Sequence, residues 1–133
     1  MKYGIKQLSL HYPHSKYNPK TMNWIALNNE DQINEINTIS DQKFVLIFKH
    51  STRCPTSSMA LSRLERNWSE DLYNEITPYY LDLVQYRSIS SKISTDYKVI
   101  HESPQIIIIK GGKSTFDTSH MAISVDIIKD QIH

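Results

Sequence analysis

The chain has little of several features that would assign it to a common class of protein. One of its 133 residues is cysteine, Cys54, so no disulfide can form within a single chain, and a secreted fold held by disulfides is not expected. Basic and acidic residues number 15 and 14, so charge predicts neither nucleic acid nor an anionic membrane as a partner. No segment approaches the ~20 apolar residues of a membrane span. Residues 1–23 also lack the apolar core of a secretory signal, and we therefore expect a cytoplasmic protein.

The length is that of one ordinary domain. Residues 1–21 are polar, contain Pro13 and Pro19, and show neither a helical nor a strand period. We expect them to be an N-terminal extension that is flexible or non-native. Regular apolar patterning begins after them, so the domain is expected to cover residues 22–133.

Strand-like and helix-like patterns alternate along this domain. A continuous apolar run at residues 44–48 is typical of a strand buried on both faces, and it is followed by a polar turn at residues 50–53. Ser124 can cap a last helix, and Gly111 and Gly112 predict a hairpin turn. Strands are expected at residues 24–27, 44–48, 79–84, 104–109 and 113–118, and helices at residues 29–39, 54–68, 86–97 and 124–132.

The order of these elements is β-α-β-α-β-α-β-β-α, with parallel crossovers early and an antiparallel hairpin late. Helices of this length between strands must cover both faces of one sheet. The sequence therefore predicts an α/β fold, with a central mixed β-sheet flanked by helices on both faces.

Cys54 is the residue with the clearest chemical potential. It directly follows a buried strand and starts the next helix, and Pro55 stands early in that helix, where its missing N–H costs nothing. Unpaired N–H groups and the positive end of the helix dipole favour an anion at this place, and a thiolate is such an anion. Lys49, His50 and Arg53 are close in sequence and could add positive charge.

An unpaired cysteine can also be an inert buried residue. Here the neighbouring residues are polar, which favours an exposed position at the strand–helix elbow instead. These neighbours are Ser51, Thr52, Arg53, Thr56 and Ser57.

The strand at residues 44–48, the elbow Ser51-Thr52-Arg53-Cys54-Pro55-Thr56-Ser57 and the later Ser103-Pro104 together resemble the thioredoxin superfamily. In that family a C-x-x-C or C-x-x-S motif opens a helix, and a cis-proline begins a later strand. The pattern F-K-H-S-x-x-C-P-x-S at residues 48–57 and the segment His101-Glu102-Ser103-Pro104-Gln105 are more specifically similar to the monothiol bacilliredoxins, the YtxJ-like group.

This resemblance implies a thioredoxin-like fold and a thiol-disulfide oxidoreductase that removes bacillithiol from S-bacillithiolated proteins through a mixed disulfide on Cys54. Bacillithiol would be a co-substrate, no cofactor would be bound, and the protein would be a monomer or an oxidation-linked dimer. Ser57 is expected to act with Cys54 by donating a hydrogen bond to the thiolate. Contacts to the substrate are expected from Arg53, Pro55, Thr56, Ser103 and a cis Pro104.

Two other functions stay open at this point. A one-cysteine peroxidase also places its sulfur at the start of a helix, although it normally has Thr where this chain has Ser51. A redox-inactive thioredoxin-like interaction or stress protein would leave Cys54 without chemistry. We expect no metal site, because His50, His101 and His120 show no ligand spacing.

Overall fold

The computed structural model describes residues 22–133, so the expected extension at residues 1–21 lies outside the described part of the chain. The elements follow the predicted alternation of strands and helices. The strands are β1 (Ile25–Ala26), β2 (Phe44–His50), β3 (Ile76–Asp82), β4 (Gln105–Lys110) and β5 (Lys113–Ser119). The helices are α2 (Gln32–Ile39), α3 (Pro55–Asn67), α4 (Arg87–Tyr97) and α5 (Val125–Ile132), with 3-10 turns η1 (Glu70–Asn74) and η2 (His120–Ala122).

The five strands form one mixed sheet in the order β1-β3-β2-β4-β5. β1 and β2 each run parallel to β3, whereas β4 runs antiparallel to both β2 and β5. The early parallel crossovers and the late hairpin are thus confirmed. Gly111 and Gly112 adopt φ values of 62° and 73° in the turn of this hairpin, a region that favours glycine.

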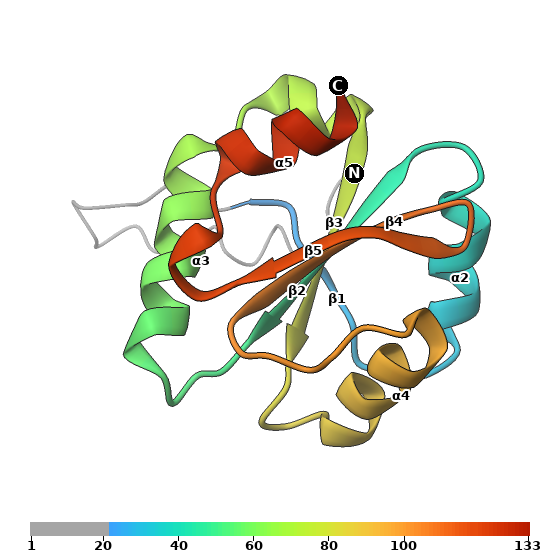
Figure 1. Cartoon of the computed structure of the whole chain (residues 1–133), viewed down its shortest axis with the longest axis horizontal. Helices are drawn as coiled ribbons and strands as arrows, with labels where there is room; N and C mark the ends of the chain where they lie inside the picture. The colour runs from blue at the N-terminus through green and yellow to red at the C-terminus, as the bar shows by residue number, and fades with distance from the viewer. Residues whose placement is uncertain (1–21) are drawn as a thin grey trace.

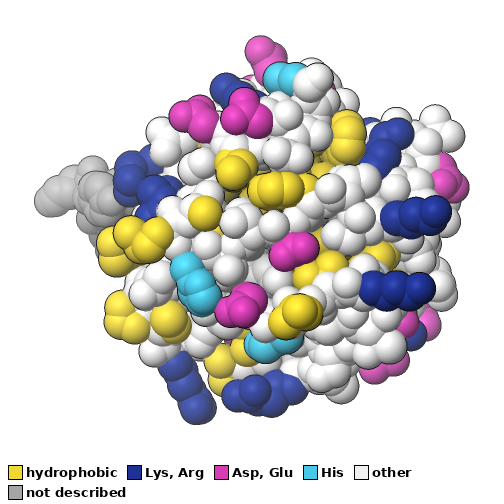
Figure 2. All heavy atoms as spheres, in the orientation of Figure 1, with side chains coloured by type: hydrophobic (Ala, Val, Ile, Leu, Met, Phe, Trp, Pro, Cys, Tyr) yellow, Lys and Arg dark blue, Asp and Glu magenta, His cyan; other side chains and the backbone are white. Residues whose placement is uncertain are grey.

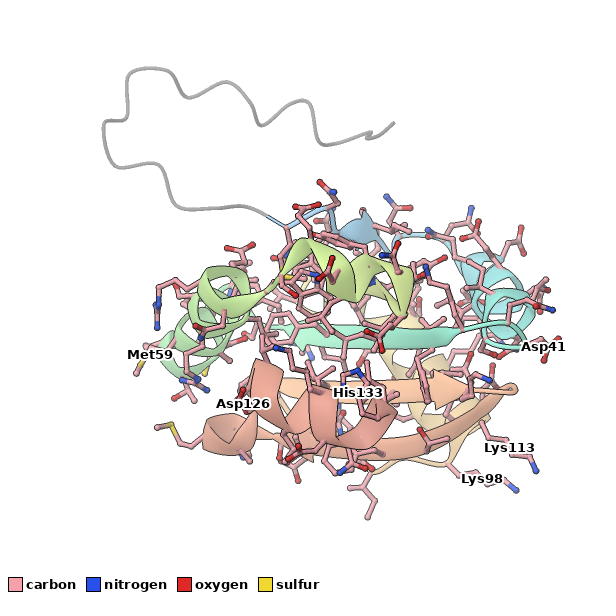
Figure 3. The ribbon with its side chains drawn as sticks, turned by 90° about the horizontal axis from the view of Figure 1, so that it is seen from above. Asp41, Met59, Lys98, Lys113, Asp126 and His133 are labelled. Atoms are coloured by element: carbon pink, nitrogen blue, oxygen red, sulfur yellow. The ribbon has the colours of Figure 1, made fainter. Side chains whose placement is uncertain are left out.

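Helices cover both faces of the sheet, as predicted. Alternate residues of β2 point to opposite sides: Val45 and Ile47 join the core under α2 and α4, while Leu46 and Phe48 join the core under α3 and α5. Figure 1 shows the two pairs of helices on opposite sides of the strands. Asp126 and His133 lie at the two ends of α5 in Figure 3. On the face in Figure 2, acidic and basic side chains are interspersed, in line with the small net charge of +1.

One edge of the sheet brings two separate segments together. Lys49 near the end of β2 pairs with Gln105 at the start of β4. The chain therefore leaves β2 toward Cys54 at the same edge where it enters β4 from Ser103 and Pro104. The site residues predicted from the sequence therefore lie at this edge.

The predicted and observed strand boundaries differ most in β2 and β3. β2 continues through Lys49 to His50, so the polar turn begins at Ser51 and not at His50. β3 begins at Ile76, three residues earlier than predicted, and contains Pro78. The helix α3 begins at Pro55, one residue after the predicted start at Cys54.

Candidate functional site

Cys54 occupies the N-cap position of α3. Its backbone is extended, with φ −114° and ψ 118°, and its carbonyl accepts the N–H groups of Ser57 at 3.0 Å and Ser58 at 3.1 Å. The side chain is partly exposed. The sulfur is therefore held at the start of a 13-residue helix with access to solvent, and the inert buried alternative does not fit this placement.

The first turn of α3 has a backbone N–H that could donate to an anion. Pro55 has no N–H, and the N–H of Thr56 makes no hydrogen bond within residues 22–133. The side chain at an N-cap is placed to accept a bond from this second helical N–H, and the positive end of the helix dipole adds to the effect. A thiolate on Cys54 would thus meet favourable groups from its own helix.

Ser57 lies fully buried one turn after Cys54, and its hydroxyl has partners other than the sulfur. Ser57 Oγ lies 2.7 Å from Nδ1 of His50 and accepts the N–H of Ser51 at 3.0 Å. The expected hydrogen bond from Ser57 to Cys54 is not among those of the described residues. The physical reason is that the hydroxyl faces the end of β2, where it joins the elbow to the strand.

His50 is buried at the last position of β2. Its ring packs against Phe48 and Tyr80, with ring centroids 5.7 Å and 5.5 Å away. Burial lowers the pKa of His50, and the charge of Asp82 opposes this shift in part. A neutral imidazole can exchange one hydrogen bond with Ser57 through Nδ1 in either tautomer. His50 and Ser57 therefore form a buried hydrogen bond beside the aromatic rings of Phe48 and Tyr80.

The segment before β4 supplies a second side of the site. The Ser103–Pro104 peptide is cis, which agrees with the expectation for Pro104. The Pro104 carbonyl accepts the N–H of His120 at 3.0 Å, whereas the backbone groups of Ser103 make no hydrogen bond within residues 22–133. Ser103 Oγ is also buried without a hydrogen-bond partner in this part of the chain. Ser103 therefore has free polar groups at the edge of the sheet that also carries Cys54.

The other residues selected from the sequence lie around the elbow. Arg53 and Pro55 are exposed, and Thr56 is partly buried. In residues 22–133, no group of three or more His, Cys, Asp or Glu side chains is placed to hold a metal ion. None of the helices in this range has the length and apolar character that a membrane crossing requires.

The sequence does not predict the structural roles of Lys49 and His50, which from sequence alone are only possible charges near the sulfur or, for His50, one of a set of histidines. Both are buried in β2 and point to opposite faces of the sheet. Their position directly after an apolar run was the available signal, because a strand buried on both faces can continue through polar residues that find partners.

Comparison with protein families gives one match over most of the chain. The model described as "Monothiol bacilliredoxin BrxC" matches residues 25–128, a range that contains Cys54, Ser57 and Pro104.

Solved structures give the same fold. A protein described as a proposed oxidoreductase with a thioredoxin fold is 30% identical and superposes with a TM-score of 0.69, covering 82% of this chain and 93% of its own. Thioredoxin from Malassezia sympodialis is 17% identical, with a TM-score of 0.64 over 89% of this chain and 95% of its own. Fasciola hepatica thioredoxin is 15% identical, with a TM-score of 0.63 over 81% of this chain and 95% of its own.

Proposed function

The chain belongs to the monothiol bacilliredoxin family, and on that premise we propose that it removes bacillithiol from S-bacillithiolated proteins through a mixed disulfide on Cys54. One observation carries this proposal: a lone, partly exposed cysteine caps α3, with serine one turn later in place of a second thiol. The membership and the thioredoxin fold support thiol redox chemistry. The thiol, the protein targets and a cytoplasmic location are parts of the proposal.

In the first step, the Cys54 thiolate attacks the bacillithiol sulfur of a modified target. A new S–S bond forms between Cys54 and bacillithiol while the bond to the target breaks. The electron pair leaves on the target sulfur, which takes a proton from water and becomes a free thiol. The disulfide is transferred, and no outside oxidant is needed.

In the second step, another thiolate must attack the bacillithiol sulfur on Cys54, because no second cysteine exists in the chain. Free bacillithiol would restore the Cys54 thiolate and leave as bacillithiol disulfide, and a reductase thiol would do the same with its own sulfur. The free backbone groups of Ser103 support pairing with an extended substrate segment at this edge of the sheet. Such pairing would hold the target disulfide without reading its sequence.

The test is transfer of the adduct between two intact proteins. A single-thiol target is S-bacillithiolated, mixed with the reduced chain, and both masses are followed. We expect the target to lose one bacillithiol while the chain gains one. With Cys54→Ser the chain should gain none, and transfer that survived this substitution would contradict the mechanism.

Two further arms separate this function from its alternatives. The same target carrying glutathione tests the choice of thiol, because equal rates for both adducts would argue against bacillithiol as the preferred co-substrate. Peroxide consumption far above that of a free thiol would favour a one-cysteine peroxidase. A wild-type chain that accepts no adduct from either target would favour the redox-inactive interaction protein.

A further inference from the structure

Lys49 is a lysine that is fully buried in β2, at 0% exposure. The alternation of the strand turns it away from Ser57 and toward α4, where Nζ lies 3.0 Å from Ser94 Oγ, 3.3 Å from the Ser90 carbonyl and 3.2 Å from His101 Nδ1. These partners carry no negative charge. Lys98 and Lys113, by contrast, project into solvent in Figure 3.

No carboxylate within residues 22–133 lies within 4.0 Å of the Lys49 ammonium. Burial lowers the pKa of Lys49 to about 8, so the group is still largely protonated at neutral pH. A buried cation without a counter-ion is costly and is usually paired. The fold therefore maintains a positive charge that nothing in the described chain neutralises.

A cavity of about 400 Å³ opens to solvent between α4 and the segment before β4. Lys49 lies behind the wall of this cavity and does not itself line the cavity. Three of the groups that hold Lys49 also line it. The polar residues of its wall are Arg87, Ser90, Ser91, Ser94, Thr95 and His101. Its volume falls within the range of small-ligand sites, about 300–1,000 Å³.

The charges around this cavity are mainly positive. Arg87 begins α4, and both Lys49 and Arg87 add to burial in lowering the pKa of His101. Glu102 acts in the opposite direction on His101, but Glu102 Oε1 lies 3.6 Å from His120 Nε2 and is half exposed. One exposed carboxylate therefore faces three basic side chains.

From this geometry we propose that the cavity binds a small oxyanion, a carboxylate or a phosphate group, which supplies the negative charge that Lys49 lacks. The Arg87 guanidinium is suited to two parallel bonds with such a group, and the serine and threonine hydroxyls can donate further ones. The site lies on the opposite face of β2 from His50 and Ser57. It is therefore separate from the proposed exchange chemistry of Cys54.

The test is a titration of the full chain with succinate, and separately with inorganic phosphate, at pH 7 and constant ionic strength set by chloride. We expect saturable amide shifts in residues 87–95 and 100–102. The anion that saturates at the lower concentration identifies the preferred group. Shifts that grow linearly without saturation for both anions would overturn the proposal.

Arg87→Gln should weaken binding about tenfold, the value of one charge-assisted hydrogen bond. The matched control is Arg66→Gln, which removes an exposed arginine from α3 and should leave binding unchanged. Equal losses in both variants would mean a general charge effect and would overturn the site.

Lys49→Met should weaken binding about tenfold or more while keeping the buried volume filled. If this variant does not fold, the wild-type pH dependence decides. Succinate stays fully ionised between pH 7 and 9.5, while Lys49 loses its proton. The other charged or titratable groups near the cavity are Arg87, His101 and Glu102. Affinity should fall about tenfold or more over this range. Equal affinity at both pH values would overturn the proposal, whatever the outcome of bacillithiol transfer.

Discussion

Nδ1 of His50 and Oγ of Ser57 lie 2.7 Å apart, joining the last residue of β2 to the first turn of α3. The same oxygen accepts the N–H of Ser51 at 3.0 Å. Ser57 thus connects the two ends of the loop that carries Cys54, the end of β2 and the start of α3. The position that holds a second cysteine in dithiol thioredoxins is here a structural hydroxyl.

Replacing this hydroxyl should cost stability. Ser57→Ala leaves a buried imidazole nitrogen and the Ser51 N–H without their partner, so we expect the free energy of unfolding to fall by about 1–3 kcal/mol. Ser58→Ala is the matched control, because Ser58 is exposed in the same helix and should change stability by about 0.5 kcal/mol or less. Urea unfolding at pH 7 measures both. Equal effects would show that the His50–Ser57 bond contributes nothing.

Ser57→Cys should change the redox behaviour of the elbow. Residue 57 lies three positions after Cys54 in the same helical turn, and its N–H bonds the Cys54 carbonyl, so the two sulfurs can reach each other. We expect an internal disulfide after oxidation, seen as a loss of two mass units, and less accumulation of the bacillithiol adduct on Cys54. Ser58→Cys provides the comparison, because its side chain is exposed. Unchanged accumulation in Ser57→Cys would contradict the proposed geometry.

The sequence predicted most of the fold because its signals were local. The apolar run at residues 44–48 marked β2, the two glycines marked the hairpin turn, and Ser124 marked the start of α5. Ser124 Oγ does accept the N–H of Ile127 at 3.1 Å. These features depend on near neighbours, so they can be recognised without knowing the tertiary structure.

What was missed depends on contacts between distant segments. Pro78 obscured the start of β3, since proline is rare inside a sheet. The structure explains how β3 accommodates Pro78. The backbone nitrogen of Pro78 is on the side of β3 that faces β1, but β1 is short and pairs only with Tyr79 and Tyr80. Within residues 22–133, the missing N–H of Pro78 therefore costs the sheet no hydrogen bond between strands. Lys49 and His50 were likewise unpredictable as core residues, because their partners lie in α3, α4 and the segment before β4.

The cap at Ser124 can be tested on its own. Ser124→Ala removes the acceptor for the Ile127 N–H at the start of α5, and we expect a loss of about 1 kcal/mol. Ser124→Asn should retain most of the stability, because asparagine is an equally good N-cap residue. Thermal and urea unfolding measure the two variants side by side. A loss of the same size in Ser124→Asn would mean that the site needs the serine for packing and not as a cap.

Lys49 should make the protein more stable in mildly alkaline solution. Its pKa is lowered by burial from 10.5 to about 8, so between these values the unfolded chain binds a proton that the folded chain has lost. Stability then rises with pH, by about 2 kcal/mol from pH 7.5 to pH 9.5. Two tyrosines act oppositely: partial burial of Tyr80 and burial of Tyr97 raise the pKa of each to about 12, so stability is lost as the pH rises above about 10.

The variant Lys49→Met isolates the lysine contribution. It should be more stable than the wild type at pH 7, because an uncompensated buried charge is gone, and its stability should not rise between pH 7.5 and 9.5. Lys113→Met, which removes an exposed lysine at the start of β5, should retain the wild-type rise. Urea unfolding in chloride, without phosphate or carboxylate buffers, gives the profiles, since a bound oxyanion would raise the pKa of Lys49 and reduce the rise. A wild-type profile that is flat over this range would mean that Lys49 keeps its ordinary pKa in the folded protein, and that a negative charge compensates its ammonium there.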